Sequence, residues 1–268
     1  MDLASLIGLI AGIAFILMTI LLLSEFQFSG VIAFADAPSA MTVIGGATAS
    51  VLIANPLGMV IKALKAAKFV FMPPAYDHAD AITRIITLSN LARREGVLAL
   101  EESAQNMDDK FLQKGVMLIV DGADPELVRS VLETEMSFVE SRHNSVRAVW
   151  DMLAAWAPAW GMVGTMVALV LMMGSLSDID ALAANMALAM ITTFYGAIVA
   201  NFLAAPISKK LGTYNAEEML LKEVLIEGML SIQNGENPRI IEEKLKAFLS
   251  PSLRDSGGGT DGGGGGGE

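Results

Sequence analysis

The stretch Met152–Ser177, MLAAWAPAWGMVGTMVALVLMMGSLS, decides the fold class of this chain. It contains no Asp, Glu, Lys or Arg, and it is long enough to cross about 30 Å of hydrocarbon, which takes roughly 20 helical residues. Three further charge-free stretches of this kind are Leu3–Ser24, Ala37–Ile61 and Ala181–Ser208. Because lipid cannot satisfy an open backbone, all four are predicted to be membrane-spanning helices of an all-α membrane protein.

The composition agrees with a membrane protein. Of the 268 residues, 53% are hydrophobic and 18% are charged, whereas a water-soluble chain of this length needs far more polar surface. The chain has no cysteine, so no disulfide is expected. The net charge of -11 argues against nucleic acid as a partner.

The basic residues predict the topology. All 18 Lys and Arg residues lie either between Lys62 and Arg147 or between Lys209 and Arg254. The two remaining connections, 25–36 and 178–180, contain acidic residues and no basic ones. Because Lys and Arg accumulate on the cytoplasmic side, the long middle segment and both termini are predicted to be cytoplasmic. The first span lacks a basic start, so we expect it to be retained rather than cleaved.

Five segments follow from this layout. Residues 1–58 are predicted to form a hairpin of the first two spans, and residues 59–149 a large helical cytoplasmic domain. Residues 150–208 are predicted to form a second, pore-lining hairpin, and residues 209–250 a helical C-terminal segment. Residues 251–268 are mostly glycine and cannot bury a core, so they are predicted to be disordered.

Proline and hydrophobic periodicity predict helices in the cytoplasmic domain. Helices are expected over Ala81–Ala92 and over Val97–Met107, the latter extending into Phe111–Val120. No helix breaker occurs between Pro125 and Pro158, so a single helix is expected to run from the cytoplasmic domain into the third span.

Two further elements lie beside the spans. The fourth span is expected to end at Pro206. The segment Met59–Val70 has lysines three residues apart with apolar residues between them, which resembles a basic amphipathic helix at the anionic inner leaflet. A plain cytoplasmic helix is the alternative.

Small and weakly polar residues follow one face of each of the last two spans. The members are Pro158, Gly161, Thr165, Ala168 and Met172 in the third span, and Asn185, Ala189, Thr193, Gly196 and Ala200 in the fourth. One interpretation is structural, because small residues let membrane helices approach and Thr hydroxyls bond nearby carbonyls. The other is a path for something polar.

The depth of two threonines favours an ion path. Thr165 lies about 20 Å above the inner end of its span, and Thr193 lies about 18 Å below the outer end of its own. Hydroxyl and carbonyl oxygens suit a hard cation, so Thr165 and Thr193 are candidate transient ligands of Na⁺. Coupled transport of H⁺ or Na⁺ also uses an intramembrane carboxylate, and no span contains one. We therefore expect another chain to supply the acid.

A charged motif lies in the cytoplasmic domain. Arg93 and Arg94 precede Glu101 and Glu102 by about two helical turns. Arg94 and Glu101 share one helical face if Gly96 does not break the helix. Such groups are usually a solvated surface, but they also suit the steering of a charged partner.

Together these features resemble the MotA/PomA family of flagellar stator subunits, within the wider MotA/TolQ/ExbB group. The resemblance is carried by the four-span layout and by the second-span motif AMTVIGGA from Ala40. It is also carried by the segment LARREG from Leu91, which Leu100-Glu101 follows, and by the prolines Pro158 and Pro206. It implies a ring of five subunits in the bacterial inner membrane around two copies of a single-span MotB/PomB-like partner. That partner supplies the aspartate and anchors to peptidoglycan, and ion flow drives the rotor protein FliG.

The resemblance also implies roles for individual residues. Arg93 and Glu101, with Arg94 and Glu102 beside them, match rotor-contacting positions, and Pro158 and Pro206 match prolines that couple ion flow to conformation. Sodium-type members resemble the patterns Gly-x-x-Gly-Thr and Thr-Thr-x-Tyr-Gly, which favours Na⁺ over H⁺ here. The implied ion path comprises Thr165, Thr192, Thr193, Gly161, Pro158 and Tyr195.

Other classes remain open at this point. A proton-driven stator and a TolQ/ExbB-like energiser are close alternatives, although relatives of the latter type have three spans. A membrane scaffold whose threonines only pack helices is an alternative of a different class. An enzyme is least expected: His78 and His143 lie far apart with no metal or triad spacing, and no catalytic residue or cofactor is predicted.

Overall fold

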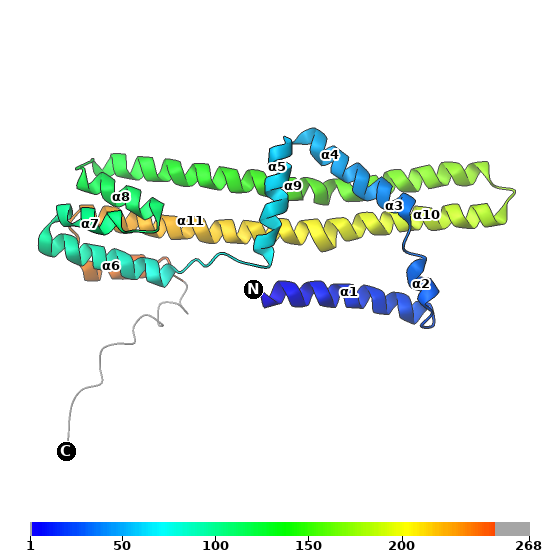
Figure 1. The fold of residues 1–268 in the computed structure, drawn as a ribbon, viewed down its shortest axis with the longest axis horizontal. Helices are drawn as coiled ribbons and strands as arrows, with labels where there is room; N and C mark the ends of the chain where they lie inside the picture. Colours follow the sequence, from blue (N-terminus) through cyan, green and yellow to red (C-terminus); the bar gives the residue numbers. More distant parts are fainter. Residues whose placement is uncertain (1, 250–268) are drawn as a thin grey trace, which may run out of the picture. The chain divides into compact units, whose positions relative to one another are not determined.

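A computed structural model describes residues 2–249, and within them every regular element is a helix (Figure 1). The predicted disorder of residues 251–268 lies outside the described part. The chain divides into two compact units. The transmembrane unit comprises residues 1–74 and 142–214, and the extramembrane unit comprises residues 75–141 with the segment that starts at Asn215.

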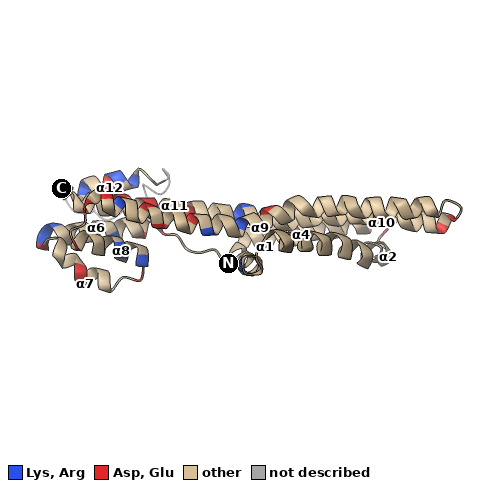
Figure 2. Ribbon diagram, turned by 90° about the horizontal axis from the view of Figure 1, so that it is seen from above, with Lys and Arg blue, Asp and Glu red and all other residues tan. Residues whose placement is uncertain are grey.

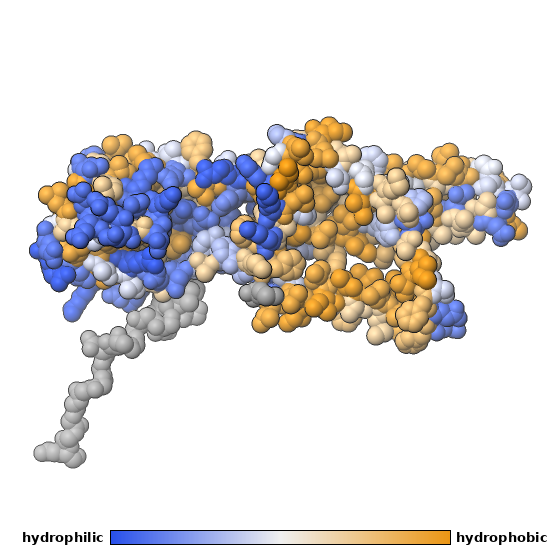
Figure 3. All heavy atoms as spheres, in the orientation of Figure 1, coloured by the Kyte–Doolittle hydropathy of each residue, from blue (hydrophilic) through white to orange (hydrophobic). Residues whose placement is uncertain are grey.

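The structure confirms four helices long and apolar enough to cross a membrane. The first is α1 (Leu3–Leu23), which has no buried residue and presents a hydrophobic surface in Figure 3. The third and fourth are α9 (Pro125–Gly174) and α10 (Ile179–Ile198). Figure 2 shows α10 free of charged residues except at its N-terminal end, as a lipid environment requires.

The second span is built from several short pieces. After α2 (Phe28–Ile32), it runs through α3 (Ala37–Ala40), a π-helical turn η1 (Met41–Gly45) and α4 (Gly46–Ala54). The helix ends at Ala54, before the charge-free stretch ends at Ile61. Asn55 is extended, with φ -133° and ψ 144°, because the ring of Pro56 disfavours helical backbone in the residue before it.

The third span confirms the prediction of one unbroken helix. α9 contains 50 residues and includes Pro158 in its interior. The fourth span contradicts the expected end at Pro206, because α10 continues through a π-helical turn η4 (Val199–Ala204) into α11 (Ala205–Gln233). The widened π turn lies directly before the proline and accommodates a ring that would clash with the preceding turn of a regular helix.

The extramembrane unit packs short helices against parts of α9 and α11. These helices are α6 (His78–Glu95), α7 (Leu100–Gln105), α8 (Lys110–Val120) and α12 (Pro238–Lys246). Figure 3 shows a hydrophilic surface over α6. The interior is apolar, and its largest fully buried side chains are Ile85, Leu100, Leu112, Val116, Val128, Leu132, Val224, Met229, Ile241 and Leu245.

The predicted helix from Val97 through Val120 is not continuous. A 3-10 turn η3 (Val97–Ala99) leads into α7, which ends at Gln105. The carboxylate of Asp109 then accepts hydrogen bonds from the backbone N–H of Phe111 at 2.9 Å and of Leu112 at 3.2 Å. This N-cap starts α8 as a separate helix, because a capping side chain competes with continuation of the helix.

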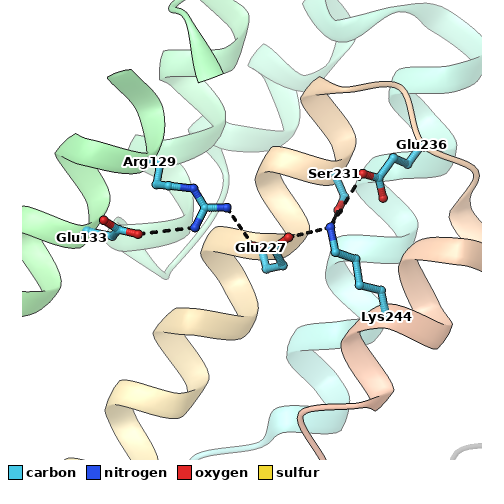
Figure 4. Close-up of polar contacts among 6 residues, drawn as sticks. All are labelled: Arg129, Glu133, Glu227, Ser231, Glu236 and Lys244. Atoms are coloured by element: carbon cyan, nitrogen blue, oxygen red, sulfur yellow. Dashed lines mark hydrogen bonds and ion pairs between the residues drawn. The ribbon is translucent and has the colours of Figure 1, made fainter. Parts of the chain in front are cut away.

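A network of charges joins α9, α11 and α12 in the extramembrane unit (Figure 4). Glu227 accepts from Arg129 at 3.0 Å and from Lys244 at 2.5 Å, and Lys244 also contacts Ser231 at 3.1 Å. The hydrogen bond from Lys244 is the largest cause of a lowered pKa at Glu227, and that from Arg129 adds to it, against the opposing effect of burial. The ionised carboxylate therefore stabilises this junction of three helices.

Candidate ion-conducting site

Three glycines allow α9 and α10 to approach closely. A Cβ atom on Gly161 would lie 3.0 Å from the carbonyl oxygen of Thr192, and one on Gly164 would lie 2.6 Å from the Cγ2 of Thr192. A Cβ atom on Gly196 would lie 2.8 Å from the carbonyl oxygen of Ala157. Small residues at the contact of membrane helices have this effect, so the predicted small-residue faces do pack against each other.

The close approach brings two hydroxyl groups together. The Oγ1 atoms of Thr165 and Thr193 are 2.8 Å apart. The Thr165 Oγ1 also lies 3.0 Å from the carbonyl oxygen of Gly161 and 3.1 Å from that of Ala189. The Thr193 Oγ1 lies 3.2 Å from the same Ala189 oxygen. Two hydroxyls and two carbonyls from facing helices thus converge; we call these four oxygens the threonine site.

The oxygens of the threonine site can accept more hydrogen bonds than its two hydroxyl protons can donate. Each hydroxyl carries one proton and two lone pairs, so the two threonines can donate only two hydrogen bonds. Their remaining lone pairs can face a cation, and neutral oxygens are suitable ligands for a hard cation. Thr165 is half-buried and Thr193 is exposed, which leaves the site accessible.

The site has no charge of its own. No Asp or Glu occurs between Met152 and Gly174, or between Ala181 and Ala204. Within residues 2–249, no group of three or more His, Cys, Asp or Glu side chains could hold a metal ion. A passing cation at the threonine site would find oxygen ligands without a counter-charge from this chain.

Thr192 is placed differently from the other two threonines. Its side chain is 1% exposed, and its hydroxyl donates to carbonyls of its own helix, at 3.1 Å from Leu188 and 2.9 Å from Ala189. Its methyl group fills the space beside Gly164. Thr192 therefore packs the helix pair, and its hydroxyl is already occupied.

Tyr195 is directed to another part of the transmembrane unit. Its hydroxyl donates to the carbonyl of Phe34 and accepts from the backbone N–H of Asp36 at 3.3 Å. The adjacent Phe194 ring meets the Phe34 ring edge-on, at 5.1 Å between centroids. These contacts hold the start of the second span against α10, apart from the threonine site.

Pro158 lies on the same helix contact as Gly196. A Cβ atom on Gly196 would lie 3.1 Å from the Pro158 Cα. Proline has no N–H, so the carbonyl of Ala154 receives no helical hydrogen bond from it. The predicted path residues Gly161 and Pro158 thus line the contact between α9 and α10, and Pro206 is the second residue of α11, which follows the π turn.

The charged motif lies in the extramembrane unit. Arg93 and Arg94 occupy the last turn of α6, Glu101 and Glu102 occupy the first turn of α7, and all four are exposed. Gly96 ends α6 with φ +87°, so Arg94 and Glu101 do not share one helical face. Each pair complements the dipole of its own helix end, and each remains available to a partner.

Sequence reasoning missed the carbonyl of Ala189, which all three threonine hydroxyls contact. Backbone oxygens carry no residue-type signal. The one available indication was generic, since Thr193 lies four residues after Ala189 and threonine in a helix often bonds the carbonyl at that spacing.

Comparison with known proteins shows which proteins the chain resembles. Residues 103–224 match the MotA/TolQ/ExbB proton channel family. The chain is 38% identical to motility protein A of Treponema phagedenis, over 94% of this chain and 95% of the relative. It is also 38% identical to chemotaxis protein PomA of Vibrio alginolyticus, over 95% and 98% respectively.

Solved structures show the same fold. The structure of C. jejuni MotAB matches with a TM-score of 0.86 and 27% identity, covering 94% of this chain and 97% of that one. The flagellar MotAB stator complex from Bacillus subtilis matches with a TM-score of 0.82 and 31% identity, covering 95% and 99%.

The chain therefore belongs to the MotA/TolQ/ExbB proton channel family, a family of multi-pass inner-membrane proteins rather than of enzymes. Within it, the chain is similar over nearly its full length to a motility protein A and to chemotaxis protein PomA, and one matching structure is a flagellar MotAB stator complex.

Proposed function

We propose that this chain is the membrane subunit of a flagellar motor stator, which conducts ions and converts ion motive force into torque. The observation that carries the proposal is the threonine site, where the hydroxyls of Thr165 and Thr193 lie 2.8 Å apart between membrane-spanning segments that contain no Asp or Glu. Ligand oxygens without a counter-charge suit a channel that is completed by another chain.

The missing charge comes from a partner. A single-span MotB/PomB-like subunit brings an aspartate beside α9 and α10 and anchors the complex to peptidoglycan. Its presence is supported by the MotAB complexes, which match this chain over nearly its full length. Copies of the present chain, five in number, surround that partner.

Sodium is the proposed ion. Na⁺ binds neutral oxygens directly, whereas a proton needs a titratable group. The threonine site adds hydroxyl and carbonyl oxygens beside the partner's aspartate, and these are ligands for Na⁺, whereas a proton would need only the aspartate. The pattern of threonines in the third and fourth spans supports the same choice. The experiment below distinguishes this sodium-driven stator from a proton-driven one.

Both termini face the cytoplasm in this proposal. The backbone N–H of Asp2 donates to the carbonyl of Phe71 at 2.9 Å, and its carboxylate pairs with Lys210. The start of α1 therefore lies at the end of the transmembrane unit that carries Lys62, Lys65, Lys68 and Lys210, here called the basic end. Because Lys and Arg accumulate inside, the basic end is cytoplasmic.

The extramembrane unit contacts the rotor. Arg93, Arg94, Glu101 and Glu102 form an exposed set of both signs around the Gly96 turn, and such a set suits a charged surface on FliG. Torque would pass from the ion path to this surface, with Pro158 and Pro206 as the positions at which α9 and the α10–α11 helix change conformation.

Swimming speed as a function of external Na⁺ tests the proposal. Cells whose stator carries Thr165→Ala or Thr193→Ala are compared with cells carrying Thr19→Ala. Thr19 is the matched control, because it lies in a span but its hydroxyl bonds only the Phe15 carbonyl of its own helix, at 2.8 Å. We expect speed to rise with Na⁺ in the parent, and both site variants to need more Na⁺ or to stop swimming.

Three results would count against the proposal. Speed that is independent of Na⁺ but sensitive to a proton uncoupler identifies a proton-driven stator. Unchanged behaviour of both site variants identifies a scaffold role for these hydroxyls. Normal motility after deletion of the gene excludes the stator function itself.

A further inference from the structure

The helix that follows the second span leaves a basic surface uncovered. α5 (Leu57–Ala66) and the 3-10 turn η2 (Ala67–Val70) bury Val60, Ala63 and Val70. These residues pack in a cluster with Val51, Val149, Trp150, Ala204 and Ile207. On the side away from this cluster, Lys62, Lys65 and Lys68 are exposed.

Contacts place α5 at the boundary of the membrane. The indole Nε1 of Trp150 donates to the carbonyl of Ala63 at 3.1 Å, which holds α5 against α9, and Figure 1 shows α5 running across α9 rather than alongside it. The preceding residue pair Asn55-Pro56 ends the second span, and Phe71 is bonded to Asp2, which caps the first span. α5 therefore lies at the level where two spans end.

Three stripes of side chains run along α5: a buried apolar stripe, an exposed apolar stripe and a stripe of lysines. In the exposed apolar stripe, Leu57, Ile61 and Leu64 are 64%, 43% and 62% exposed, which is unusual for large apolar side chains in water. At 3.6 residues per turn, this apolar stripe lies between the buried Val60 and Ala63 on one side and Lys62 and Lys65 on the other. An apolar stripe flanked by lysines is the arrangement of a helix that lies in a membrane interface.

The lysines lie in a segment of the sequence that contains no acidic residue. No Asp or Glu occurs in the sequence between Asp36 and Asp77. Among the described residues no ion pair is found for Lys62, Lys65 or Lys68, and the nearest acid of the first span, Asp2, is paired with Lys210. The three cations are thus available to anions outside the chain.

We propose that α5 and Lys68 form a binding site for anionic phospholipid. Lys62, Lys65 and Lys68 contact the headgroup phosphates, while Leu57, Ile61 and Leu64 contact the acyl chains just beneath. Lipid bound there would stabilise the packing of α5 on α9, to which the hydrogen bond from Trp150 to the Ala63 carbonyl contributes. The site is independent of which ion the protein conducts and of whether it drives a motor.

Tryptophan quenching by brominated lipid tests the site, because Trp150 is bonded directly to α5. The full-length chain with Trp156→Phe and Trp160→Phe keeps Trp150 as its sole tryptophan, which is excited selectively at 295 nm or above. It is reconstituted into bilayers that contain equal fractions of phosphatidylglycerol and phosphatidylcholine, with bromine on the chains of one lipid or the other. We expect brominated phosphatidylglycerol to quench more, with an apparent preference of about tenfold.

Two lysine variants complete the test. The variant Lys62→Gln, Lys65→Gln, Lys68→Gln should lose the preference, and the charge-conserving variant with Arg at the three positions should keep it. Helical circular dichroism and quenching in brominated phosphatidylcholine alone verify that both variants are folded and inserted. Inorganic phosphate at millimolar concentration should leave the preference unchanged, since the site needs the acyl chains as well.

Equal quenching by the two lipids in the parent chain would overturn the proposal. So would a preference that survives in the folded Gln variant, because the lysines would then not be its source. A preference abolished by inorganic phosphate would identify a free anion site instead.

Discussion

The hydroxyl oxygens of Thr165 and Thr193 lie 2.8 Å apart across α9 and α10, whereas the hydroxyl of the adjacent Thr192 bonds carbonyls of its own helix. Consecutive residues of a helix point about 100° apart, so neighbours in sequence can have different surroundings. Thr193 faces the threonine site and Thr192 packs against Gly164. The two residues are therefore expected to differ in function despite their identical chemistry.

Valine substitutions at these two positions separate the roles. Valine keeps the shape of threonine but removes the hydroxyl, so Thr193→Val should weaken the apparent affinity for Na⁺ about tenfold. Thr192→Val should change it by less than about twofold, because its hydroxyl is already bonded within the helix. The measurement is swimming speed against external Na⁺. Equal effects of the two substitutions would contradict the assignment.

Gly196→Ala should destabilise the helix pair. The added methyl would lie 2.8 Å from the backbone carbonyl of Ala157, which cannot move without displacing α9. We expect a loss of about 1 to 3 kcal/mol in the free energy of unfolding, measured by thermal denaturation of the full-length chain in detergent. Gly8→Ala is the control, since nothing lies within 4 Å of its added Cβ; it should be neutral or slightly stabilising.

Gly96→Ala should disturb the charged motif. Gly96 has φ +87° and ψ 164°, a backbone conformation that side chains disfavour at a cost of about 1 to 3 kcal/mol. No atom lies within 4 Å of a Cβ there, so the effect comes from the backbone alone. We expect a lower unfolding temperature and reduced motility. Gly58→Ala, in a helix with equally open space, should retain both.

Arg93→Glu should impair motility without affecting stability. Arg93 is exposed at the end of α6, and charge reversal at such a site changes the steering of a partner more than the fold. We expect smaller swarms and an unchanged unfolding temperature. Lys110→Glu, an equal charge change at another exposed site of this unit, should swarm normally. Normal swarming of the Arg93 variant would remove it from the rotor surface.

Glu227→Gln should reduce stability in a pH-dependent way. The pKa of Glu227 is lowered in the folded chain, first by Lys244 and also by Arg129. Its contribution is therefore present above the ordinary carboxyl pKa of about 4.3 and is lost as the pH falls through the folded value. We expect the variant to be about 1 kcal/mol less stable at pH 7.

The difference between the parent chain and Glu227→Gln should shrink as the pH falls below about 4. Thermal unfolding of the two chains between pH 7 and pH 3 measures it. Glu95→Gln removes an exposed carboxylate for which the described residues show no ion pair, and it should unfold like the parent at pH 7. A difference that is as large at pH 3 as at pH 7 would show that the effect is steric rather than ionic.

Some boundaries could be predicted from local chemistry and others could not. Asn55 and Pro56 do end the second span, because a proline acts on the residue beside it. Pro206 does not end the fourth span, because the π turn Val199–Ala204 accommodates its ring. The conformation of Gly96 could not be predicted from its residue type either, because glycine is found both inside helices and at positive φ. In the structure Gly96 has a positive φ, and α6 ends there.

The sequence by itself determined four charge-free stretches long enough to span a membrane, the basic end and the absence of any acid within the spans. These follow from one local rule, that hydrocarbon admits neither open backbone nor unpaired charge. The tertiary structure alone decided which oxygens meet, placing Thr165 and Thr193 at the Ala189 carbonyl and Tyr195 at Phe34. That outcome depends on how α9 and α10 rotate against each other, which the glycine contacts set across residues distant in sequence.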